Sequence, residues 1–447
     1  MRGKMEGMDI EVCREMLSFI EKSPSCFHVI ANLKERLAAA GFQELDERRD
    51  WQVCAGGNYY VTRNDSSIIA FRIPEGELKG FHMAASHSDS PTFKIKERPE
   101  MEAEKRYVRL NTEKYGGMIL STWLDRPLSV AGRVTVCGDA GEARGGRSIL
   151  TKLVNLDTDL LVIPNVAIHM NRDMNKGVEY NPQTDMLPLY GECGGSGDVQ
   201  ELLREQVAEA AGVKPEAILG QDLFLYVRDK GRIFGREGEF VLSPRLDDLQ
   251  CVYASMQALL TSVPREYISL CAVFDNEEVG SGTRQGADST FLEDVVARVC
   301  NDLAGQEDGL GGVCLRNRML AGSFLISADN AHAVHPNHPE LSDPTNRPYL
   351  NGGIVIKYHG SQKYTTDAVS GARMKSLCMR AGVPYQTYAN RSDIAGGSTL
   401  GNISAAHVSV DSVDIGLPQL AMHSAVETGG VRDTAYALRV LQEFFGE

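Results

Sequence analysis

The stretch YISLCAVFDNEEVG, residues 267–280, decides the fold class. Its first part, YISLCAVF, is an apolar run of strand length, and the acidic residues Asp275, Glu277 and Glu278 follow it at once. A helical pattern from Asp247 to Leu260 precedes this stretch, and a second helical pattern, FLEDVVARVC, comes after it. Apolar strands that alternate with amphipathic helices predict an α/β fold, with a mixed central sheet covered by helices on both faces.

The same alternation extends outward in both directions. Residues 10–41 predict a pair of helices, and the runs NYYVTR, SIIAFRI and GFHMAAS predict strands of the same sheet. Downstream, SFLISAD, GGIVIKY and AHVSVDS predict further strands, and TAYALRVLQEFF predicts a last helix. Between about Lys94 and Phe240, short strands and Gly-rich turns dominate. We therefore expect one discontinuous domain, residues 1–93 and 241–447, and an inserted, mostly β domain, residues 94–240.

The composition argues against several classes of protein. The chain has 447 residues and a formal net charge of −14, and no basic run supplies the charge that binding to nucleic acid or an anionic membrane requires. It contains no apolar run of the roughly 18 residues that a membrane span needs, and its N-terminal segment lacks the apolar core of an export signal. A cytoplasmic location is therefore expected. The ten cysteines are scattered without any Cys-x-x-Cys pair, which favours buried free thiols over disulfides or thiolate metal sites.

Candidate metal ligands follow the predicted strands or begin a predicted helix. In open α/β sheets the functional residues lie beyond the carboxyl ends of the strands. The residues at such positions are two histidines and three acids: His87, Asp247, Glu278, Asp329 and His423. Nitrogen and oxygen ligands of this kind suit zinc, manganese or cobalt. Five ligands exceed what one ion needs, so we expect two ions, with Asp247 as the bridge. His87 and Asp329 would complete one site, and Glu278 and His423 the other.

Two further acids have expected roles beside these ligands. Glu277 is adjacent to Glu278 but points in a different direction, so we expect it to act as the general base that takes a proton from metal-bound water. Asp89, two residues after His87, is placed to hydrogen-bond the free nitrogen of that imidazole or to act near it.

Each of these residues also has an ordinary structural interpretation. A histidine after a strand is commonly a surface residue, and the pair Asp247-Asp248 favours a helix N-terminus through the helix dipole. Glu277 and Glu278 alone are compatible with a solvated loop. The histidines of the segment after Asp329 are compatible with a polar loop closed by prolines; these are His332, His335 and His338. The metal centre is favoured because five such coincidences in one βα region are improbable.

Five motifs carry a resemblance to a known family. They are SHSDSP at 86–91, SPRLDD at 243–248, FDNEEVGS at 274–281, DNAHAVHPN at 329–337 and QLAMHS at 419–424. With these motifs the sequence resembles aspartyl aminopeptidase and its bacterial relatives, which are two-metal exopeptidases of the cytosol. The resemblance implies the same five zinc ligands and the same base as the residues themselves do. It also implies that the inserted domain serves dimerisation and that dimers assemble into a dodecamer.

The resemblance implies two further site residues, and a third, His332, is expected beside them. His169, in IHMNR at 168–172, matches a histidine that reaches the active site of a neighbouring subunit; a buried histidine at a strand end is the alternative. Lys357 matches the lysine that recognises an acidic substrate side chain; a solvated lysine at a strand end is the alternative. His332 is expected to contact substrate. The segment 390–399 departs from some family members because it lacks the Pro-Cys that can precede its Gly-Ser-Thr turn.

The predicted function is a metallo-aminopeptidase that hydrolyses N-terminal residues, preferably Asp or Glu, from peptides. Two alternatives stand beside it. The first is a metal-dependent deacylase or other small-amide hydrolase on the same centre, which N-acetylation of the peptide would distinguish. The second is a non-catalytic shell or cargo protein, against which the presence of all five ligands and the base argues.

Overall fold

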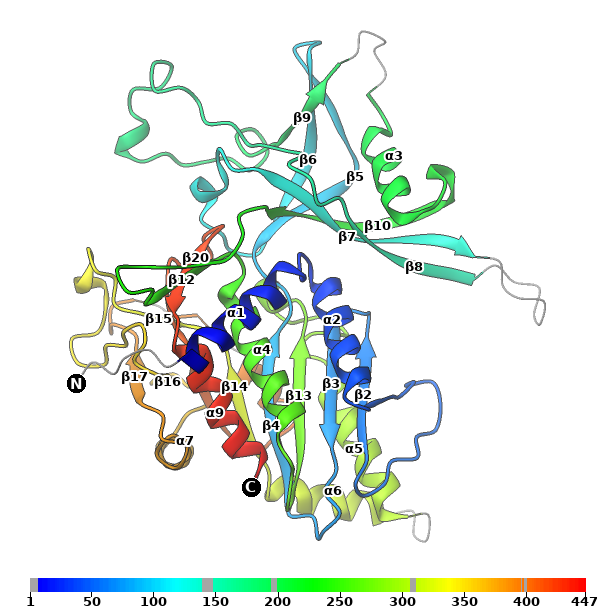
Figure 1. Cartoon of the computed structure of the whole chain (residues 1–447), viewed down its shortest axis with the longest axis vertical. Coiled ribbons are helices and arrows are strands. Elements are labelled where there is room, and N and C mark those ends of the chain that lie inside the picture. Colours follow the sequence, from blue (N-terminus) through cyan, green and yellow to red (C-terminus); the bar gives the residue numbers. More distant parts are fainter. Residues whose placement is uncertain (1–6, 139–147, 194–198, 306–310, 395, 398–399) are drawn as a thin grey trace.

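The computed structural model describes residues 7–138, 148–193, 199–305, 311–394, 396–397 and 400–447. Figure 1 shows two lobes, a lower one in which helices cover a long twisted sheet and an upper one built around a second sheet. Of the segment 390–399, residues Ala395, Ser398 and Thr399 lie outside the described residues.

The lower sheet contains nine of the described strands and is mixed, as predicted. Its order is β1 (Gln43–Glu44), β2 (Asn58–Arg63), β3 (Ser67–Arg72), β13 (Tyr267–Phe274), β4 (Gly80–His87), β14 (Phe324–Ala328), β18 (Asp411–Gly416), β16 (Ile354–Tyr358) and β17 (Tyr385–Ala389). At its centre, β13, β4, β14 and β18 run parallel, whereas β3 and β16 are antiparallel to their central neighbours. In the β13–β4 pair, Phe274 lies opposite His87. The two strands therefore end at the same edge of the sheet.

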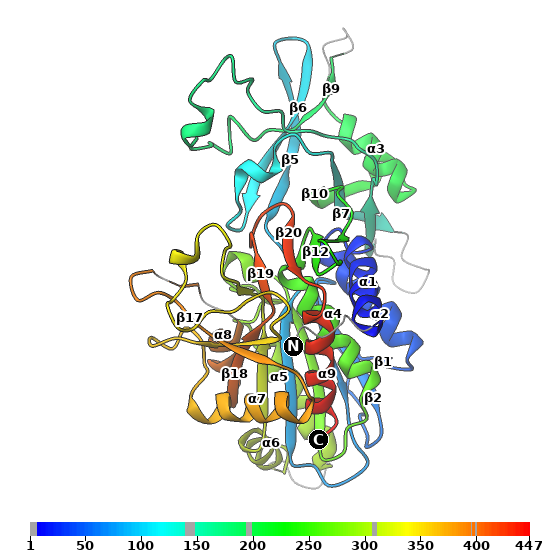
Figure 2. The ribbon, with the colours of Figure 1, turned by 60° about the vertical axis from the view of Figure 1, so that its left-hand side comes forward.

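Helices cover both faces of this sheet because its strands are apolar on both sides. Within β13, Cys271 and Val273 enter one core, and Leu270 and Ala272 enter the other. The first core is covered by α1 (Gly7–Glu21), α2 (Cys26–Ala39), α4 (Leu246–Thr261), α7 (Ala368–Arg380) and α9 (Asp433–Phe445). The second is covered by α5 (Phe291–Ala304), α6 (Gly311–Ala321) and α8 (Leu400–Ala405). Figure 2 shows α1, α2, α4 and α9 together on one side.

The upper lobe is an antiparallel sheet with one helix and its own apolar core. The order of its described strands is β8 (Ser148–Asn155), β7 (Leu128–Gly138), β10 (Ile218–Val227), β5 (Thr92–Ala103), β6 (Tyr107–Tyr115) and β9 (Leu189–Glu192), and its helix is α3 (Leu202–Ala211). This arrangement agrees with the expected β character of the insertion. The division into residues 1–93 plus 241–447 and residues 94–240 stays a prediction.

A third, smaller sheet joins parts of the chain that are far apart in sequence. Its described strands are β11 (Arg232–Phe234), β12 (Phe240–Ser243), β20 (Glu427–Gly430), β19 (Pro418–Leu420) and β15 (Ala331–His332). The β12–β20 pair places Ser243 opposite Glu427, directly before α4 begins. This sheet therefore brings the start of α4 next to the late segment that contains His423.

Two predictions from composition can be compared with the structure. All ten cysteines are free, although Cys54, Cys137 and Cys314 are exposed instead of buried. Among the helices of the described residues, none combines the length and the apolar character that crossing a membrane requires.

Candidate metal centre

Five segments of the chain meet at the edge where the central parallel strands end. His87 is the last residue of β4, and Asp329 directly follows β14. Glu277 and Glu278 follow β13 in the 3-10 turn η4 (Glu277–Val279). Asp247 lies in the first turn of α4, and His423 follows β19. The strand-end rule accounts for His87, Asp329 and the two glutamates, because β13, β4 and β14 are parallel neighbours, whereas the third sheet brings Asp247 and His423 beside each other.

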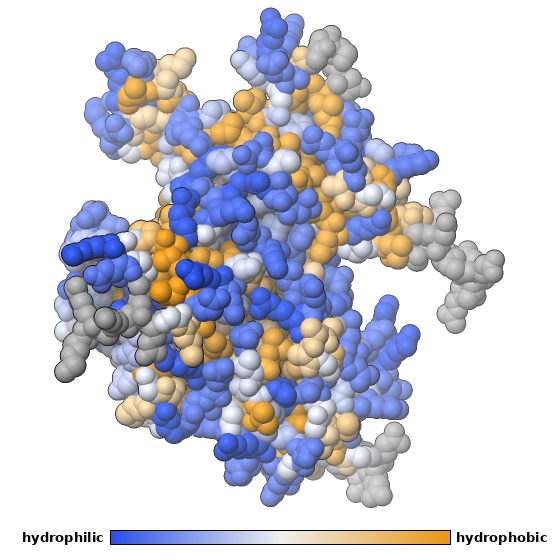
Figure 3. Space-filling view, in the orientation of Figure 1, coloured by the Kyte–Doolittle hydropathy of each residue, from blue (hydrophilic) through white to orange (hydrophobic). Residues whose placement is uncertain are grey.

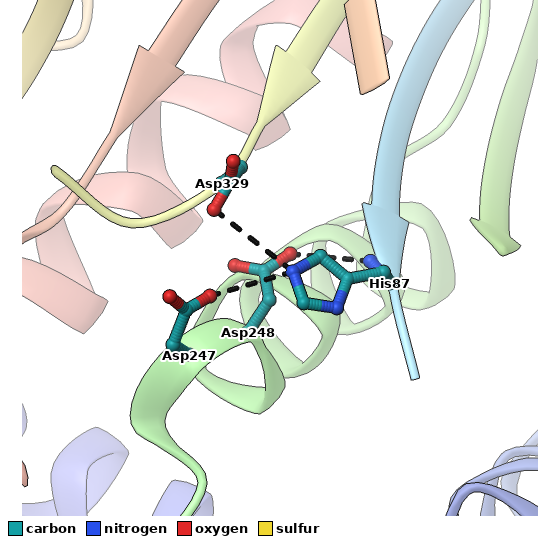
Figure 4. Close-up of side chains that lie close together, drawn as sticks. All are labelled: His87, Asp247, Asp248 and Asp329. Carbon is teal, nitrogen blue, oxygen red and sulfur yellow. Dashed lines mark hydrogen bonds and ion pairs between the residues drawn. The ribbon is translucent and has the colours of Figure 1, made fainter. Parts of the chain in front are cut away.

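The carboxylate of Asp247 lies between the two histidines. Its Oδ1 is 3.4 Å from His87 Nε2, and its Oδ2 is 3.6 Å from His423 Nε2. Asp329 Oδ1 lies 3.9 Å from the same Nε2 atom of His87, and Figure 4 shows both acids directed at this nitrogen. Glu278 Oε2 likewise lies 3.4 Å from the Nε2 atom of His423. The predicted ligands thus form two groups that share Asp247, and in each group the ligand atoms lie within 4.8 Å of one another.

Both histidines are oriented in the same way. His87 Nδ1 lies 3.0 Å from the carbonyl oxygen of Asp89, and His423 Nδ1 lies 2.5 Å from that of Gly117. A carbonyl only accepts, so these partners assign the proton of each ring to Nδ1. The lone pair of each Nε2 then faces the carboxylates, which is the usual arrangement of a metal-binding imidazole.

The oxygen atoms of the cluster fit a cation. Among the described residues, Asp247 Oδ1, Asp248 Oδ1 and Glu278 Oε1 are buried and accept no hydrogen bond. A buried carboxylate oxygen without a partner is costly unless a positive charge compensates it. Carboxylates and imidazoles without thiolates are ligands that zinc accepts, so the residues present fit a zinc site.

The electrostatics of the cluster show an excess of negative charge. Burial, opposed by His87 and reinforced by the nearby Asp329, Asp89 and Asp247, raises the pKa of Glu277 to about 8. Burial likewise raises the pKa of Glu278 well above its usual range, with Asp247 adding to the effect. Such a concentration of buried acids is typical of a site that holds divalent cations.

Comparison with known proteins likewise indicates a protein that uses zinc. The family described as "Aminopeptidase I zinc metalloprotease (M18)" matches residues 19–445. The chain belongs to the M18 family. It is 47% identical to "Probable M18 family aminopeptidase 2" of Clostridium novyi over 98% of this chain and 99% of the relative. A Pseudomonas savastanoi pv. phaseolicola protein of the same name is 40% identical over 98% of this chain and 99% of that protein.

Solved structures agree with this membership. The chain superimposes on a structure of the Ape4 and Nbr1 complex with a TM-score of 0.93 and 35% identity, covering 100% of this chain and 87% of that one. It superimposes on an S. cerevisiae mApe1 dodecamer with a TM-score of 0.82 and 28% identity, covering 98% and 96%. The family resemblance and the α/β fold predicted from the sequence are confirmed, and the M18 chain is a zinc metallo-aminopeptidase, an exopeptidase.

Asp89 of the M18 chain holds the loop that carries the two glutamates. Its Oδ1 accepts the backbone N–H of Glu277 at 3.1 Å, and its Oδ2 accepts that of Glu278 at 3.2 Å. The hydroxyl of Tyr115 donates to the same Oδ2 at 2.7 Å. The hydrogen bond to His87 that the sequence suggested for Asp89 is made by its carbonyl oxygen, because the nearest carboxylate oxygen lies 3.4 Å from Nδ1.

Lys357 lies beside the cluster and is not solvated. Its side chain is only 3% exposed, and its Nζ donates to the carbonyl oxygen of Asn330 at 2.9 Å and lies 3.6 Å from Asp329 Oδ2. Burial lowers the pKa of this ammonium, but Asp329, together with Tyr364, Asp414 and Asp247, more than offsets that effect, so the pKa is raised. Lys357 is therefore a buried cation at the edge of the ligand group.

The other two predicted residues are not part of the ligand groups formed by the described residues. His332 is in β15, with an exposed side chain whose ring centroid is 6.2 Å from that of Tyr388. His169 is exposed on the long connection between β8 and β9 in the upper lobe.

Two acids of this site, Asp248 and Glu427, had no role predicted from the sequence. Asp248 Oδ2 accepts the backbone N–H of His87 at 3.2 Å, and Asp248 lies within the group of His87, Asp247 and Asp329. Glu427 contacts the backbone of two ligands. Asp248 was visible in the SPRLDD motif, whereas the only signal for Glu427 is an acid between the apolar Val426 and the Gly-rich end of SAVETGG.

Proposed function

We propose that this chain removes acidic N-terminal residues, Asp or Glu, from peptides with the help of two divalent cations, zinc or alternatively manganese or cobalt. The observation that carries the proposal is the position of Asp247, whose two oxygens face two different histidines at 3.4 and 3.6 Å. A carboxylate in this position would be able to hold two ions, one on each oxygen. His87 and Asp329 would complete the first site, and Glu278 and His423 the second.

The residues of the chain have separate tasks in hydrolysis. When bound, the cations polarise the scissile carbonyl and lower the pKa of water. Glu277 takes the proton of the attacking water and later delivers it to the leaving amine. Asp89 fixes the backbone of Glu277, so that this carboxylate keeps its position during proton transfer. A carboxylate of the cluster pairs with the free α-amine of the substrate, which explains why a blocked N-terminus would not be accepted.

The preference for an acidic first residue follows from the charge balance. A carboxylate side chain entering a site rich in acids requires a local cation. Lys357 supplies it, because it is buried and lies 3.6 Å from Asp329. His332, whose side chain is exposed in β15 shortly after Asp329, contributes to the substrate-binding surface.

Self-association completes the proposal. The strand β8 is at the edge of the upper sheet, and Ile149, Leu150 and Leu153 are 70%, 49% and 39% exposed on it. Figure 3 shows apolar surface over this arm. An edge strand with apolar side chains is suited to pairing with another chain. Together with the solved mApe1 dodecamer, this supports dimers formed through residues 94–240 that assemble into a dodecamer, with His169 reaching a neighbouring active site.

A panel of dipeptides that differ only in the first residue tests the proposed substrate class. Initial rates are measured with protein stripped of metal and reconstituted with zinc, manganese or cobalt. We expect Asp and Glu dipeptides to be hydrolysed faster than Leu, Ala and Lys dipeptides, and N-acetylated Glu dipeptides to be inert. Equal rates for Leu and Glu would contradict the acidic preference. Hydrolysis of the acetylated peptides would contradict the role of the free amine.

A further inference from the structure

Glu427 joins two of the predicted ligands through their backbones. It is the first residue of β20, and only 2% of it is exposed. Its Oε2 accepts the backbone N–H of Asp247 at 3.0 Å, and its Oε1 accepts the backbone N–H of His423 at 2.7 Å. One buried carboxylate therefore holds together a helix start and a turn that lie far apart in the sequence.

The turn that carries His423 needs such support. His423 has a φ of 65°, and Ala421 in the same turn has a φ of 57°. Residues that bear a side chain adopt this left-handed conformation only at an energetic cost. The hydrogen bond from the N–H of His423 to the buried carboxyl oxygen of Glu427 stabilises the turn. It thereby keeps the imidazole directed at Asp247 and Glu278.

The carboxylate of Glu427 is itself fixed from the side. The amide of Gln419 donates to Glu427 Oε1 at 3.4 Å, and Asn330 donates to Gln419 Oε1 at 2.8 Å. Asn330 also donates to the carbonyl of Leu246 at 3.1 Å, immediately before Asp247. This buried network links β15, β19, β20 and the start of α4, so the position of Glu427 is determined by several elements at once.

Of the two residues whose backbones Glu427 holds, Asp247 belongs to both proposed cation sites and His423 to the second alone, so these contacts act mainly on the second site. Glu427 bonds the backbones of Asp247 and His423, whereas the described contacts of His87 and Asp329 do not include it. Its own oxygens are used by N–H groups, and it is absent from the ligand groups formed by the described residues. We infer that Glu427 is a positioning residue that builds the second cation site, formed by Asp247, Glu278 and His423. This inference rests on the two-cation centre proposed above.

Counting bound zinc at controlled free zinc tests the inference. The zinc-loaded full chain is equilibrated with a series of chelator-buffered zinc concentrations, and zinc per chain is measured. We expect the unaltered protein to bind two ions. In Glu427→Gln, the first ion should bind nearly as before, because His87 and Asp329 keep their contacts, and the second should require about tenfold or more higher free zinc, as loss of an outer partner of a metal ligand typically causes. Peptide hydrolysis by this variant should recover as free zinc is raised.

Asp433 provides a matched control. Its buried carboxylate, at the start of α9, also accepts two backbone N–H groups, those of Asn351 at 2.7 Å and Gly353 at 3.1 Å. Asp433→Asn makes the same chemical change away from the ligands. We expect it to lower the melting temperature and to leave both zinc affinities unchanged. If Glu427→Gln fails to fold, Glu427→Asp keeps the charge and is expected to show a smaller weakening of the second ion only.

The outcomes separate the inference from the proposed function. Two ions bound by Glu427→Gln with unchanged affinity, or an equal weakening of both ions, would overturn the role of Glu427 while leaving the two-cation centre in place. A single ion bound by the unaltered protein at saturating zinc would overturn the two-cation centre and this inference with it.

Discussion

Glu277 and Glu278 are adjacent in the sequence, and both lie near His87. Only Glu278 also joins His423, with its Oε2 3.4 Å from His423 Nε2, and it belongs to the group that shares Asp247. Glu277→Gln is therefore expected to lower kcat by about 10²-fold or more, as removal of a general base does, and to leave bound zinc unchanged. Glu278→Gln, in contrast, should lose zinc. Turnover of Glu277→Gln within a few-fold of the original value would show that another group is the base.

Lys357 is tested by a ratio of rates because it also contacts Asp329. Lys357→Ala is expected to lower kcat/KM for Glu dipeptides much more than for Leu dipeptides, since only the acidic side chain loses its cation. Lys363→Ala is a suitable control because Lys363 Nζ bonds the carbonyl oxygen of Gly396 and lies outside the cluster. Equal losses on both dipeptides would mean that Lys357 serves to hold Asp329 and does not select the substrate.

For single residues, the sequence predicted the site residues that directly follow strands. It did not predict the residues whose side chains hydrogen-bond to backbone N–H groups. His87, Asp329 and Glu278 were predicted from their places after apolar runs, and the structure brings them together. Glu427 was missed because its partners are N–H groups, which every residue except proline has. No pattern of residue types identifies such a contact.

At the scale of elements, β4 carries a buried histidine that links it to α9. His82 Nδ1 donates to the carbonyl oxygen of Phe444 at 2.8 Å, and its Nε2 accepts from Arg373 at 2.8 Å, with Glu447 3.7 Å away. Its ring stacks on Tyr267 with centroids 3.8 Å apart. Burial lowers the pKa of His82 to about 3, and Arg373 and Arg380 contribute to this effect.

The lowered pKa of His82 makes stability depend on pH. The unfolded chain takes up this proton below about pH 6.5 and the folded chain does not, so the stabilisation is complete above that pH and is lost as the pH falls. As the pH falls from about 6.5 to 4.5, the free energy of unfolding should decrease in both the unaltered protein and His82→Gln. The decrease should be steeper in the unaltered protein, by about 1.4 kcal/mol per pH unit. Urea unfolding of both proteins measures the difference. If the free energy of unfolding depends on pH equally in the two proteins, His82 is not kept neutral in the folded state.

Local periodicity predicted the elements better than it predicted their partners. The helical pattern from Asp247 to Leu260 agrees with α4, and YISLCAVF agrees with β13, because each is set by local spacing of apolar residues. The pairing of β12 with β20 was not predicted, since it joins residues far apart in sequence through backbone hydrogen bonds. The short helix α8 was also not predicted.

At the scale of the whole molecule, the exposed position of His169 gives a test of assembly. If His169 acts in a neighbouring subunit, two inactive variants can repair each other when they assemble together. We expect mixtures of Glu277→Gln and His169→Ala chains, unfolded and refolded together, to be more active than either variant alone. In such mixtures some sites combine an intact Glu277 with an intact His169. Refolding each variant separately before mixing is the control, and no gain in the joint mixture would place His169 outside the reaction.

The upper lobe contributes directly to the geometry of the second group of ligands. The carbonyl of Gly117, just beyond β6, accepts from His423 Nδ1, and the N–H of Ile119 donates to the carbonyl oxygen of His423 at 3.0 Å. Gly116 packs so closely against Glu278 that an added Cβ would lie 3.1 Å from the Cβ of that residue. Excising the insertion would consequently not leave a minimal working enzyme, since the lower lobe would lose the brace that sets one imidazole. A substitution in residues 116–119 of the upper lobe can therefore disturb His423 and Glu278 without changing either residue directly.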